Sequence, residues 1–246
     1  MKSTCIFTLP RSGSSVLLSV LSAGSGSQSA AEFLNLPPGH LTRAIRLNLS
    51  GDFHADVKVV PMLTPSLKAQ LRDFAITEYS RRVQIIEEHP TPLIFKAPLT
   101  STFFTFKKEL LQDALSRFKP IVLIREDGFK GLLSWLICEN LQTWHSTSGA
   151  KLAPSEKLLV SRDEFIALIG SYNELVNLYN QTQPNQRITF EQFEDDPIAA
   201  LKERFDLKLP IPPLTLRPFI EDHEGCFEDV DELRRLFAEK ALRIAR

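Results

Sequence analysis

Residues 5–21 read CIFTLPRSGSSVLLSVL, an apolar segment followed by a small polar turn and a second apolar segment. The first segment has the composition of a strand, and a helix is expected to begin near Ser14 or Ser15. A strand that stops at Leu9 and turns through residues 10–13 into a helix directs several backbone N–H groups at one point. The stretch therefore predicts an anion-binding loop at the N-terminus of a helix.

The side chains of this loop also suit an anion. Arg11 supplies a positive charge and a planar fork of donors. Gly13 allows the backbone to approach a phosphate closely, and Ser14 and Ser15 add hydroxyl donors. The phosphate loop of nucleotide kinases has a lysine directly before its Ser or Thr, and here Gly13 occupies that position. A plain strand-turn-helix connection rich in small residues remains the alternative.

Short apolar runs alternate with helical patterns along the rest of the chain. The runs typical of strands are CIFTL (5–9), DVKVV (56–60), PLIF (92–95), IVLI (121–124) and RITF (187–190). Apolar residues at helical spacing occur in 67–86, 129–137 and 165–179, and a last helix is expected to begin near Asp229 and to carry Leu242. This alternation predicts an α/β fold with a single doubly wound, mostly parallel sheet flanked by helices.

The sequence also indicates where helices begin and where long loops lie. Ser161 and Glu164 have the spacing of a capping box, and Asp196 followed by a proline is typical of a helix start. The stretch 22–56 is rich in Ser, Gly and Pro, and 207–228 is rich in Pro. Both stretches predict long functional loops.

The composition limits the classes of function. With 246 residues, 43% hydrophobic and 24% charged, the chain suits one domain over 1–246. A net charge of −1 gives no overall basic field for nucleic acid, so an anion site must be local. The three cysteines lack metal or disulfide spacing and are expected to be buried thiols in a reducing compartment. No apolar stretch has the length of a membrane span and no signal-peptide core is seen, which predicts a cytoplasmic protein.

Cations follow three of the predicted strands, namely Arg11, Lys96 and Arg125. Ligands of an open parallel sheet bind outside the carboxyl ends of its strands. Three cations at one edge therefore favour a ligand with more than one anionic group. For Lys96, a surface ion pair is the alternative.

Three segments together resemble the sulfotransferase superfamily, whose members transfer a sulfuryl group from 3′-phosphoadenosine 5′-phosphosulfate (PAPS) on a P-loop-like fold. PRSGSS is similar to the family's 5′-phosphosulfate loop, IVLIREDGFKGLLSW to its 3′-phosphate motif, and RITFEQFEDDPIAALKERFDL to its late tyrosine-glutamate-aspartate-leucine segment. The segments occur in the family's order and span nearly the whole chain. The FKAP stretch and the lack of a C-terminal basic, glycine-rich motif favour the tyrosylprotein and bacterial branches.

The resemblance implies roles for individual residues. The residues expected to hold the 5′-phosphosulfate are Arg11, Ser12, Gly13, Ser14 and Ser15, and those expected to hold the 3′-phosphate are Arg125 and Ser134. Arg11 and Lys96 would stabilise the charge that builds on the departing phosphate oxygen, without a metal. The interval from Arg125 to Ser134 is one residue longer than in the family because Glu126 intervenes, which would place the extra residue in the loop.

The acceptor hydroxyl needs a base, and Glu32 is similar to the catalytic glutamate of the tyrosylprotein branch. A carboxylate with its usual pKa of about 4.3 is a weak base, so burial beside Phe33 and Leu34 would have to raise that pKa. A solvated glutamate without a catalytic role is the alternative. His40 and His54 compete as bases, because an imidazole titrates near neutral pH.

The expected activity is that of a PAPS-dependent O-sulfotransferase that releases adenosine 3′,5′-bisphosphate. Its acceptor would be a hydroxyl of a small molecule, a saccharide, a lipid or a tyrosyl peptide, with a pocket shaped by 33–56, 145–160 and 210–228. Two alternatives remain open. One is a P-loop kinase acting on a small molecule with magnesium, and the other is a nucleotide-binding protein without turnover. Neither nucleic acid nor a membrane span is expected.

Overall fold

The computed structural model describes residues 2–35, 65–101, 103–104, 107–141, 154–212, 220 and 222–244. The strand expected at 56–60 lies outside the described residues, as do the candidate bases His40 and His54.

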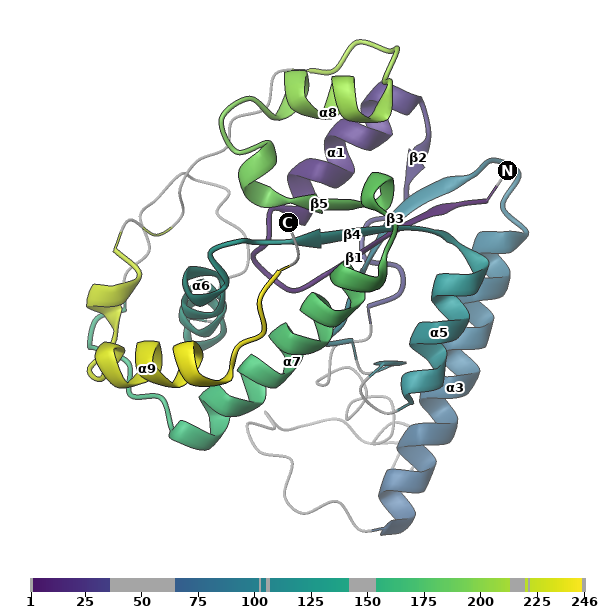
Figure 1. Cartoon of the computed structure of the whole chain (residues 1–246). Coiled ribbons are helices and arrows are strands. Elements are labelled where there is room, and N and C mark those ends of the chain that lie inside the picture. Colours follow the sequence, from purple (N-terminus) through teal and green to yellow (C-terminus); the bar gives the residue numbers. More distant parts are fainter. Residues whose placement is uncertain are drawn as a thin grey trace. The chain divides into compact units, whose positions relative to one another are not determined.

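The core element is a five-stranded parallel sheet (Figure 1). Its strands are β1 (Thr4–Thr8), β2 (Gln28–Ser29), β3 (Leu93–Pro98), β4 (Lys119–Ile124) and β5 (Arg187–Thr189). The strand order is β2-β3-β1-β4-β5, so the sheet is extended on both sides of the first strand. Residues 121–124 are buried on both faces, as a central parallel strand requires. With helices flanking the sheet, the predicted α/β, doubly wound class is confirmed.

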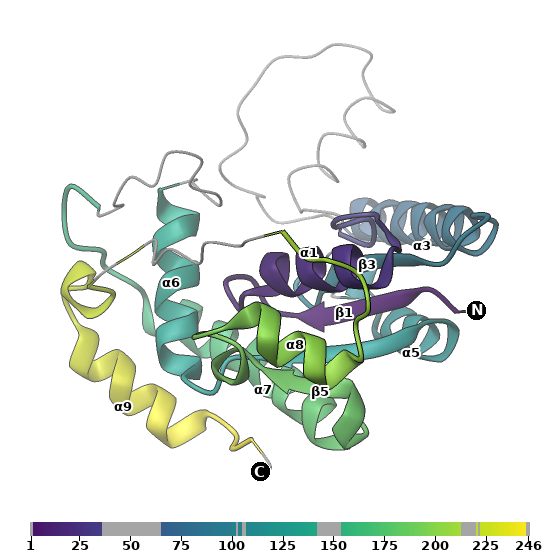
Figure 2. The same ribbon diagram turned by 90° about the horizontal axis from the view of Figure 1, so that it is seen from above.

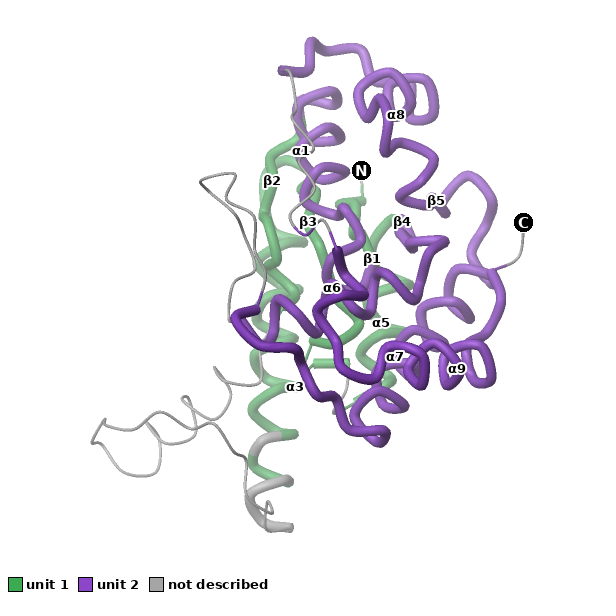
Figure 3. Tube along the Cα trace, turned by 90° about the vertical axis from the view of Figure 1, so that its left-hand side faces the viewer, with its two compact units in different colours: residues 1–7, 27–120 green, residues 8–26, 121–246 purple. Residues whose placement is uncertain are grey.

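The elements form two compact units, each built from two segments of the chain (Figure 3). Unit 1 comprises residues 1–7 and 27–120, and unit 2 comprises residues 8–26 and 121–246. The helices of unit 1 include α3 (Pro65–Glu87) and α5 (Lys108–Arg117). Those of unit 2 are α1 (Ser14–Ser25), α6 (Gly128–Asn140), α7 (Arg162–Gln181), α8 (Pro197–Phe205) and α9 (Val230–Lys240). The single domain over 1–246 stays a prediction.

In unit 1, α3 and α5 lie side by side (Figures 1 and 2) and are joined by polar contacts. The Tyr79 hydroxyl donates to Asp113 at 2.9 Å, and Arg117 pairs with Glu87 at 3.0 Å. Burial, reinforced by the bond to Asp113, raises the pKa of Tyr79 well above its usual value. These contacts join α5, which was not predicted from the sequence, to α3, which was.

In unit 2, α1 packs against α8, and α7 packs against α6 and α9 (Figures 1 and 2). The buried stripe of α7 agrees with the predicted helical spacing and consists of Phe165, Ile169, Tyr172, Leu175, Val176 and Tyr179. The Ser161 hydroxyl caps α7 by accepting from the Glu164 backbone N–H at 3.3 Å. Within the described ranges the Glu164 side chain does not return a bond, so only half of the predicted capping box forms. Asp196 caps α8 as predicted.

Two expectations about boundaries were wrong. Leu242 lies beyond the end of α9 and is 43% exposed, because a residue outside the last turn no longer follows the buried stripe. The stretch 22–56, expected to be a loop, contains β2, whose two exposed residues pair with β3 through the backbone alone.

The three cysteines are buried, as predicted, and their thiols are free. Among the helices that the structure describes, none is long and apolar enough to cross a membrane.

Candidate functional site

The loop between β1 and α1 has the predicted strand-turn-helix form. Arg11 and Gly13 adopt left-handed backbone conformations, with φ of 66° and 80°. The helix begins at Ser14 directly after the loop, with no side-chain cap and no acidic residue in its first turn among the described residues. A helix N-terminus without a carboxylate keeps its positive dipole end uncompensated, which favours an anion at this position.

Ser12 holds the loop together from inside. Its side chain is buried, and its hydroxyl donates to the Leu9 carbonyl at 2.7 Å and contacts the Thr8 hydroxyl. Because this hydroxyl is engaged inside the loop, an anion would meet the backbone N–H of Ser12 rather than its side chain.

Gly13 is closely approached by an aromatic ring. A Cβ atom at this position would lie 2.4 Å from Cδ2 of Phe190, in the turn that follows β5. The Arg125 guanidinium lies over the same ring, with its carbon atom 4.8 Å from the ring centroid. Phe190 thus contacts both the loop and the arginine. The sequence analysis did not single it out, although it belongs to the segment that resembles the family's late motif.

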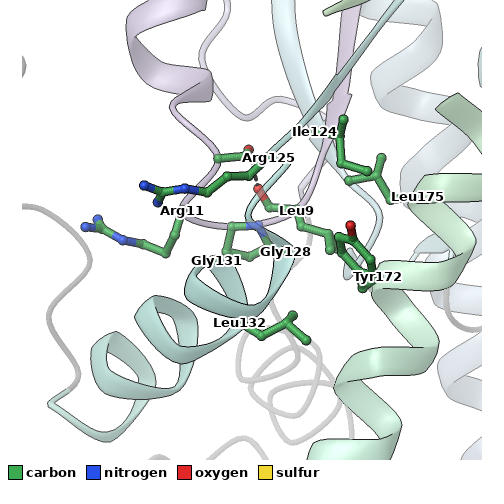
Figure 4. A pocket seen from close by; sticks show the side chains of 11 residues that line it. Leu9, Arg11, Ile124, Arg125, Gly128, Gly131, Leu132, Tyr172 and Leu175 are labelled. Carbon is green, nitrogen blue, oxygen red and sulfur yellow. Dashed lines mark hydrogen bonds between the residues drawn. The ribbon is translucent and has the colours of Figure 1, made fainter. Parts of the chain in front are cut away.

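Two of the predicted anion-binding segments meet directly. Arg11 Nε donates to Ser134 Oγ at 3.2 Å, and Ser134 is buried on α6. Arg125 lies over the same helix, because a Cβ atom at Gly131 would be 3.6 Å from the Arg125 Cδ atom. Figure 4 shows that the Arg11 and Arg125 side chains extend toward the same side. We call Arg11, Arg125 and Ser134 the arginine cluster.

Glu126, the extra residue in the segment that resembles the 3′-phosphate motif, lies in the loop before the helix, as predicted. Asp127 is the N-cap of α6, and its carboxylate accepts from the Lys130 N–H at 3.0 Å. The additional residue is therefore absorbed ahead of the helix, where it does not rotate Ser134 away from Arg11.

A cavity of about 20 Å³ lies beside the arginine cluster, lined by residues of the loop, of α6 and of α7 (Figure 4). This volume is enough for about one water molecule and not for a nucleotide. Tyr172 lines it, and burial together with the nearby carboxylates Glu191, Asp127 and Glu126 raises the pKa of Tyr172 to about 12. The guanidinium groups point away from Tyr172 in Figure 4, so the candidate anion site is on their side and not in this cavity.

The field around the arginine cluster is positive although the whole chain has a net charge of −1. Burial, followed by the positive charges of Lys130, Arg125 and Arg11, lowers the pKa of His223 to about 4. His223 is therefore neutral at pH 7, and its buried Nδ1 atom has no hydrogen-bond partner in the described part of the chain. Three cations, Lys130, Arg125 and Arg11, thus lie within electrostatic range of one imidazole, as a local anion site requires.

A second cavity of about 380 Å³ opens beside the first turns of α6, with a size in the range of small-ligand sites. Its lining is formed by Asp127, Phe129, Lys130, Leu133, Asp222, His223, Glu224 and Arg234. Arg234 pairs with Glu224 and lies over the Phe129 ring, 5.0 Å from its centroid. The lining charges are mixed: Arg234 pairs with Glu224, whereas Asp127 and Asp222 accept from backbone N–H groups.

In unit 1, the candidate base Glu32 pairs with the candidate cation Lys96 at 2.8 Å. The Lys96 side chain is only 7% exposed, whereas that of Glu32 is 44% exposed. Asn35 donates to the other oxygen of the Glu32 carboxylate at 2.7 Å. The ion pair expected as the alternative for Lys96 forms, but around a buried ammonium rather than on the surface.

Two expectations about this pair need correction. Glu32 is not buried beside Phe33 and Leu34, because Leu34 turns into the core while the carboxylate turns to solvent. Lys96 does not follow its strand but lies inside β3. The strand continues past it because the backbone after β2 extends the pairing, with the Lys96 N–H donating to the Ala31 carbonyl at 2.7 Å.

The predicted site residues thus form two groups, each described within its own unit. Unit 2 holds Arg11, Ser12, Gly13, Ser14, Ser15, Arg125 and Ser134, and unit 1 holds Glu32 and Lys96. Among the described residues, no group of His, Cys, Asp and Glu side chains is arranged to bind a metal ion.

Comparisons with known proteins give a weak structural likeness and no match in sequence. No protein-family model matches the chain, and no curated protein matches its sequence. Among solved structures, the chain is similar to a sugar kinase from Janibacter sp. HTCC2649 in its unliganded crystal structure. The two chains are 12% identical, the match covers 84% of this chain and 95% of that chain, and the TM-score is 0.36. A likeness of this size assigns neither a family nor a function to the chain.

Proposed function

We propose that the chain is a PAPS-dependent O-sulfotransferase. The observation that carries the proposal is the hydrogen bond from Arg11 to Ser134, which joins the loop before α1 to the helix that follows Arg125. The loop lacks the lysine that a kinase places on its phosphates. Two guanidinium groups beside an uncapped helix N-terminus suit a ligand that carries two separate anionic groups.

The proposed binding roles are those that the resemblance implies, and the arrangement of the residues supports them. The 5′-phosphosulfate would be held by the N–H groups at the start of α1, by the Ser14 and Ser15 hydroxyls and by Arg11. The 3′-phosphate would be held by Arg125, with Ser134 fixing the orientation of Arg11 between the two anions. Guanidinium groups recognise phosphate oxygens with two parallel hydrogen bonds, so their orientation matters as much as their charge.

The chemistry is a displacement at sulfur. The bond between sulfur and the 5′-phosphate oxygen would break while a bond forms between sulfur and the acceptor oxygen. The acceptor proton would pass to the Glu32 carboxylate, and the charge left on the phosphate would be stabilised by Arg11 and Lys96. The Glu32 carboxylate is open to solvent and fixed in position by Lys96 and Asn35, so an acceptor could reach it, but these donors do not supply the rise in pKa that burial was expected to give. His40 and His54 remain the alternative bases.

The transfer is tested by incubating the protein with sulfur-labelled PAPS and a panel of alcohols, saccharides, lipids and tyrosyl peptides. We expect label to reach one acceptor class, and Arg11→Ala to abolish the transfer. Phosphate transfer from magnesium-ATP to the same panel would support the kinase alternative instead. Binding of PAPS without transfer to any acceptor would favour a nucleotide-binding protein without turnover.

A further inference from the structure

Two carboxylates join the segment after Arg125 to the segment at the end of β5. Each carboxylate belongs to one segment and accepts hydrogen bonds from the other. The Glu191 carboxylate accepts from the backbone N–H of Glu126 at 2.9 Å and from that of Asp127 at 3.3 Å. In return, the Thr189 hydroxyl donates to the Glu126 carboxylate at 3.1 Å. The two segments lie side by side because β4 and β5 are paired in parallel up to Ile124 and Thr189. We call Glu126, Thr189 and Glu191 the loop clamp.

Arg125 emerges directly from the clamped loop. Its guanidinium lies over the Phe190 ring, and its Nε atom is 3.9 Å from the Glu191 carboxylate, too far for a hydrogen bond. Among the described residues this buried Nε atom has no hydrogen-bond partner. The Glu191 carboxylate therefore makes its hydrogen bonds to the backbone of the loop and faces Arg125 only as a long ion pair.

A carboxylate at this distance has two opposing effects on an anion that binds Arg125. Its negative charge weakens the attraction of the guanidinium for a phosphate. Its hydrogen bonds fix the backbone from which Arg125 extends, and the Phe190 ring next to it holds the guanidinium beside Arg11. Bidentate phosphate binding depends on the orientation of the fork, so the two effects predict opposite changes in affinity when the Glu191 carboxylate is removed.

We propose that Glu191 is a positioning residue that sets Arg125 for the 3′-phosphate, with Glu126 and Thr189 as the second half of the same clamp. The inference rests on the proposed function, since it assigns the 3′-phosphate to Arg125. It gives a role to Glu126, the residue by which the chain departs from the family's spacing. It also predicts a difference between the two anion sites, because the hydrogen bonds of the clamp are made to the segment of Arg125 and not to the loop before α1.

The experiment compares the affinities for adenosine 3′,5′-bisphosphate and adenosine 5′-monophosphate by titration calorimetry. In Glu191→Ala, we expect the affinity for the bisphosphate to fall about tenfold, the range of one charge-assisted contact, and the affinity for the monophosphate to stay within about twofold. Glu191→Gln keeps one acceptor oxygen and should retain most of the preference for the bisphosphate over the monophosphate. Thr189→Val removes the hydrogen bond to Glu126 and should also reduce this preference. The matched control is Glu194→Ala, which removes an exposed carboxylate from the same segment.

The possible outcomes are distinct. The inference is overturned if both nucleotides weaken in parallel, or if Glu191→Ala binds the bisphosphate as tightly as the unmodified protein or more tightly. The second result would show that the charge of Glu191 outweighs its positioning. If Glu191→Ala does not fold, the same comparison in Thr189→Val decides. If the unmodified protein shows no preference for the bisphosphate, the proposed function fails and the inference fails with it.

Discussion

Gly13 is subject to two independent constraints, one from the backbone and one from packing. Its φ is 80°, and a Cβ atom would lie 2.4 Å from the Phe190 ring. We expect Gly13→Ala to lower the free energy of unfolding by about 2 kcal/mol or more, because strain and overlap add. Urea unfolding followed by circular dichroism measures the change.

Gly170 in α7 is the matched control for Gly13. Nothing lies within 4 Å of a Cβ atom at this exposed helical position. Gly170→Ala should therefore raise the free energy of unfolding by up to about 1 kcal/mol, the difference in helix propensity. Equal effects of the two substitutions would contradict the account of the loop.

His223 gives the stability a dependence on pH with a defined sign. Its pKa is lowered to about 4 in the folded chain, mainly by burial, whereas the unfolded value is about 6.5. Between these two values the unfolded state binds more protons, so the contribution of His223 is full above about pH 6.5 and decreases as the pH falls toward 4. Unfolding free energies measured at pH 7 and pH 5 should differ less in His223→Gln than in the unmodified protein. An unchanged difference would show that another group causes the dependence.

Glu32 is the residue that we propose as the base of the chemical step. Glu32→Gln removes the base and should lower the transfer rate by a factor of about 100 or more. Binding of adenosine 3′,5′-bisphosphate should change little, because no role in holding the nucleotide is assigned to this carboxylate. Glu109→Gln, an exposed carboxylate on α5 of the same unit, is the control. A loss confined to nucleotide affinity would assign Glu32 a positioning role instead.

At the scale of elements, the start of α7 depends on one hydroxyl. Ser161 accepts from the Glu164 N–H, and the Glu164 side chain adds no return bond among the residues described. Ser161→Ala should lower the free energy of unfolding by about 1 kcal/mol, and Ser161→Asp should not. If the two variants are equally stable, the cap does not stabilise the helix.

Most of the long helices with periodic apolar side chains could be predicted from the sequence, whereas the short helix α5 and the backbone-held strand β2 were not predicted. The stripe of α7 and the Asp196 start of α8 are encoded in side chains and were predicted correctly. β2 consists of two exposed residues, Gln28 and Ser29, whose pairing with β3 uses only main-chain groups. Main-chain pairing also extends β3 beyond Lys96. Lys96 therefore lies inside the strand and not after its end, where the sequence had placed it.

The residues of the candidate site also differ in whether the sequence could indicate them. Arg11, Arg125 and Ser134 carry charge or a hydroxyl at motif positions, so the sequence pointed to them. Phe190 and Glu191 act on a glycine, on a guanidinium face and on backbone N–H groups. Contacts of this kind leave no spacing signal in a single sequence, because their partners are main-chain atoms or are distant in the chain.

Over the whole molecule, the residues proposed to bind the nucleotide belong to unit 2, and the proposed base Glu32 belongs to unit 1. A chain with a net charge of −1 attracts anions only where cations are gathered, and in unit 2 that place is the arginine cluster with Lys130. Binding is thus expected to depend on a few named side chains and not on the overall charge.

The central claim is tested most directly by titrating the protein with adenosine 3′,5′-bisphosphate in the presence of EDTA. The account predicts binding without magnesium, binding that is tighter than that of ATP, and loss of binding in Arg11→Ala. Magnesium-dependent binding of ATP together with no binding of the bisphosphate would contradict it.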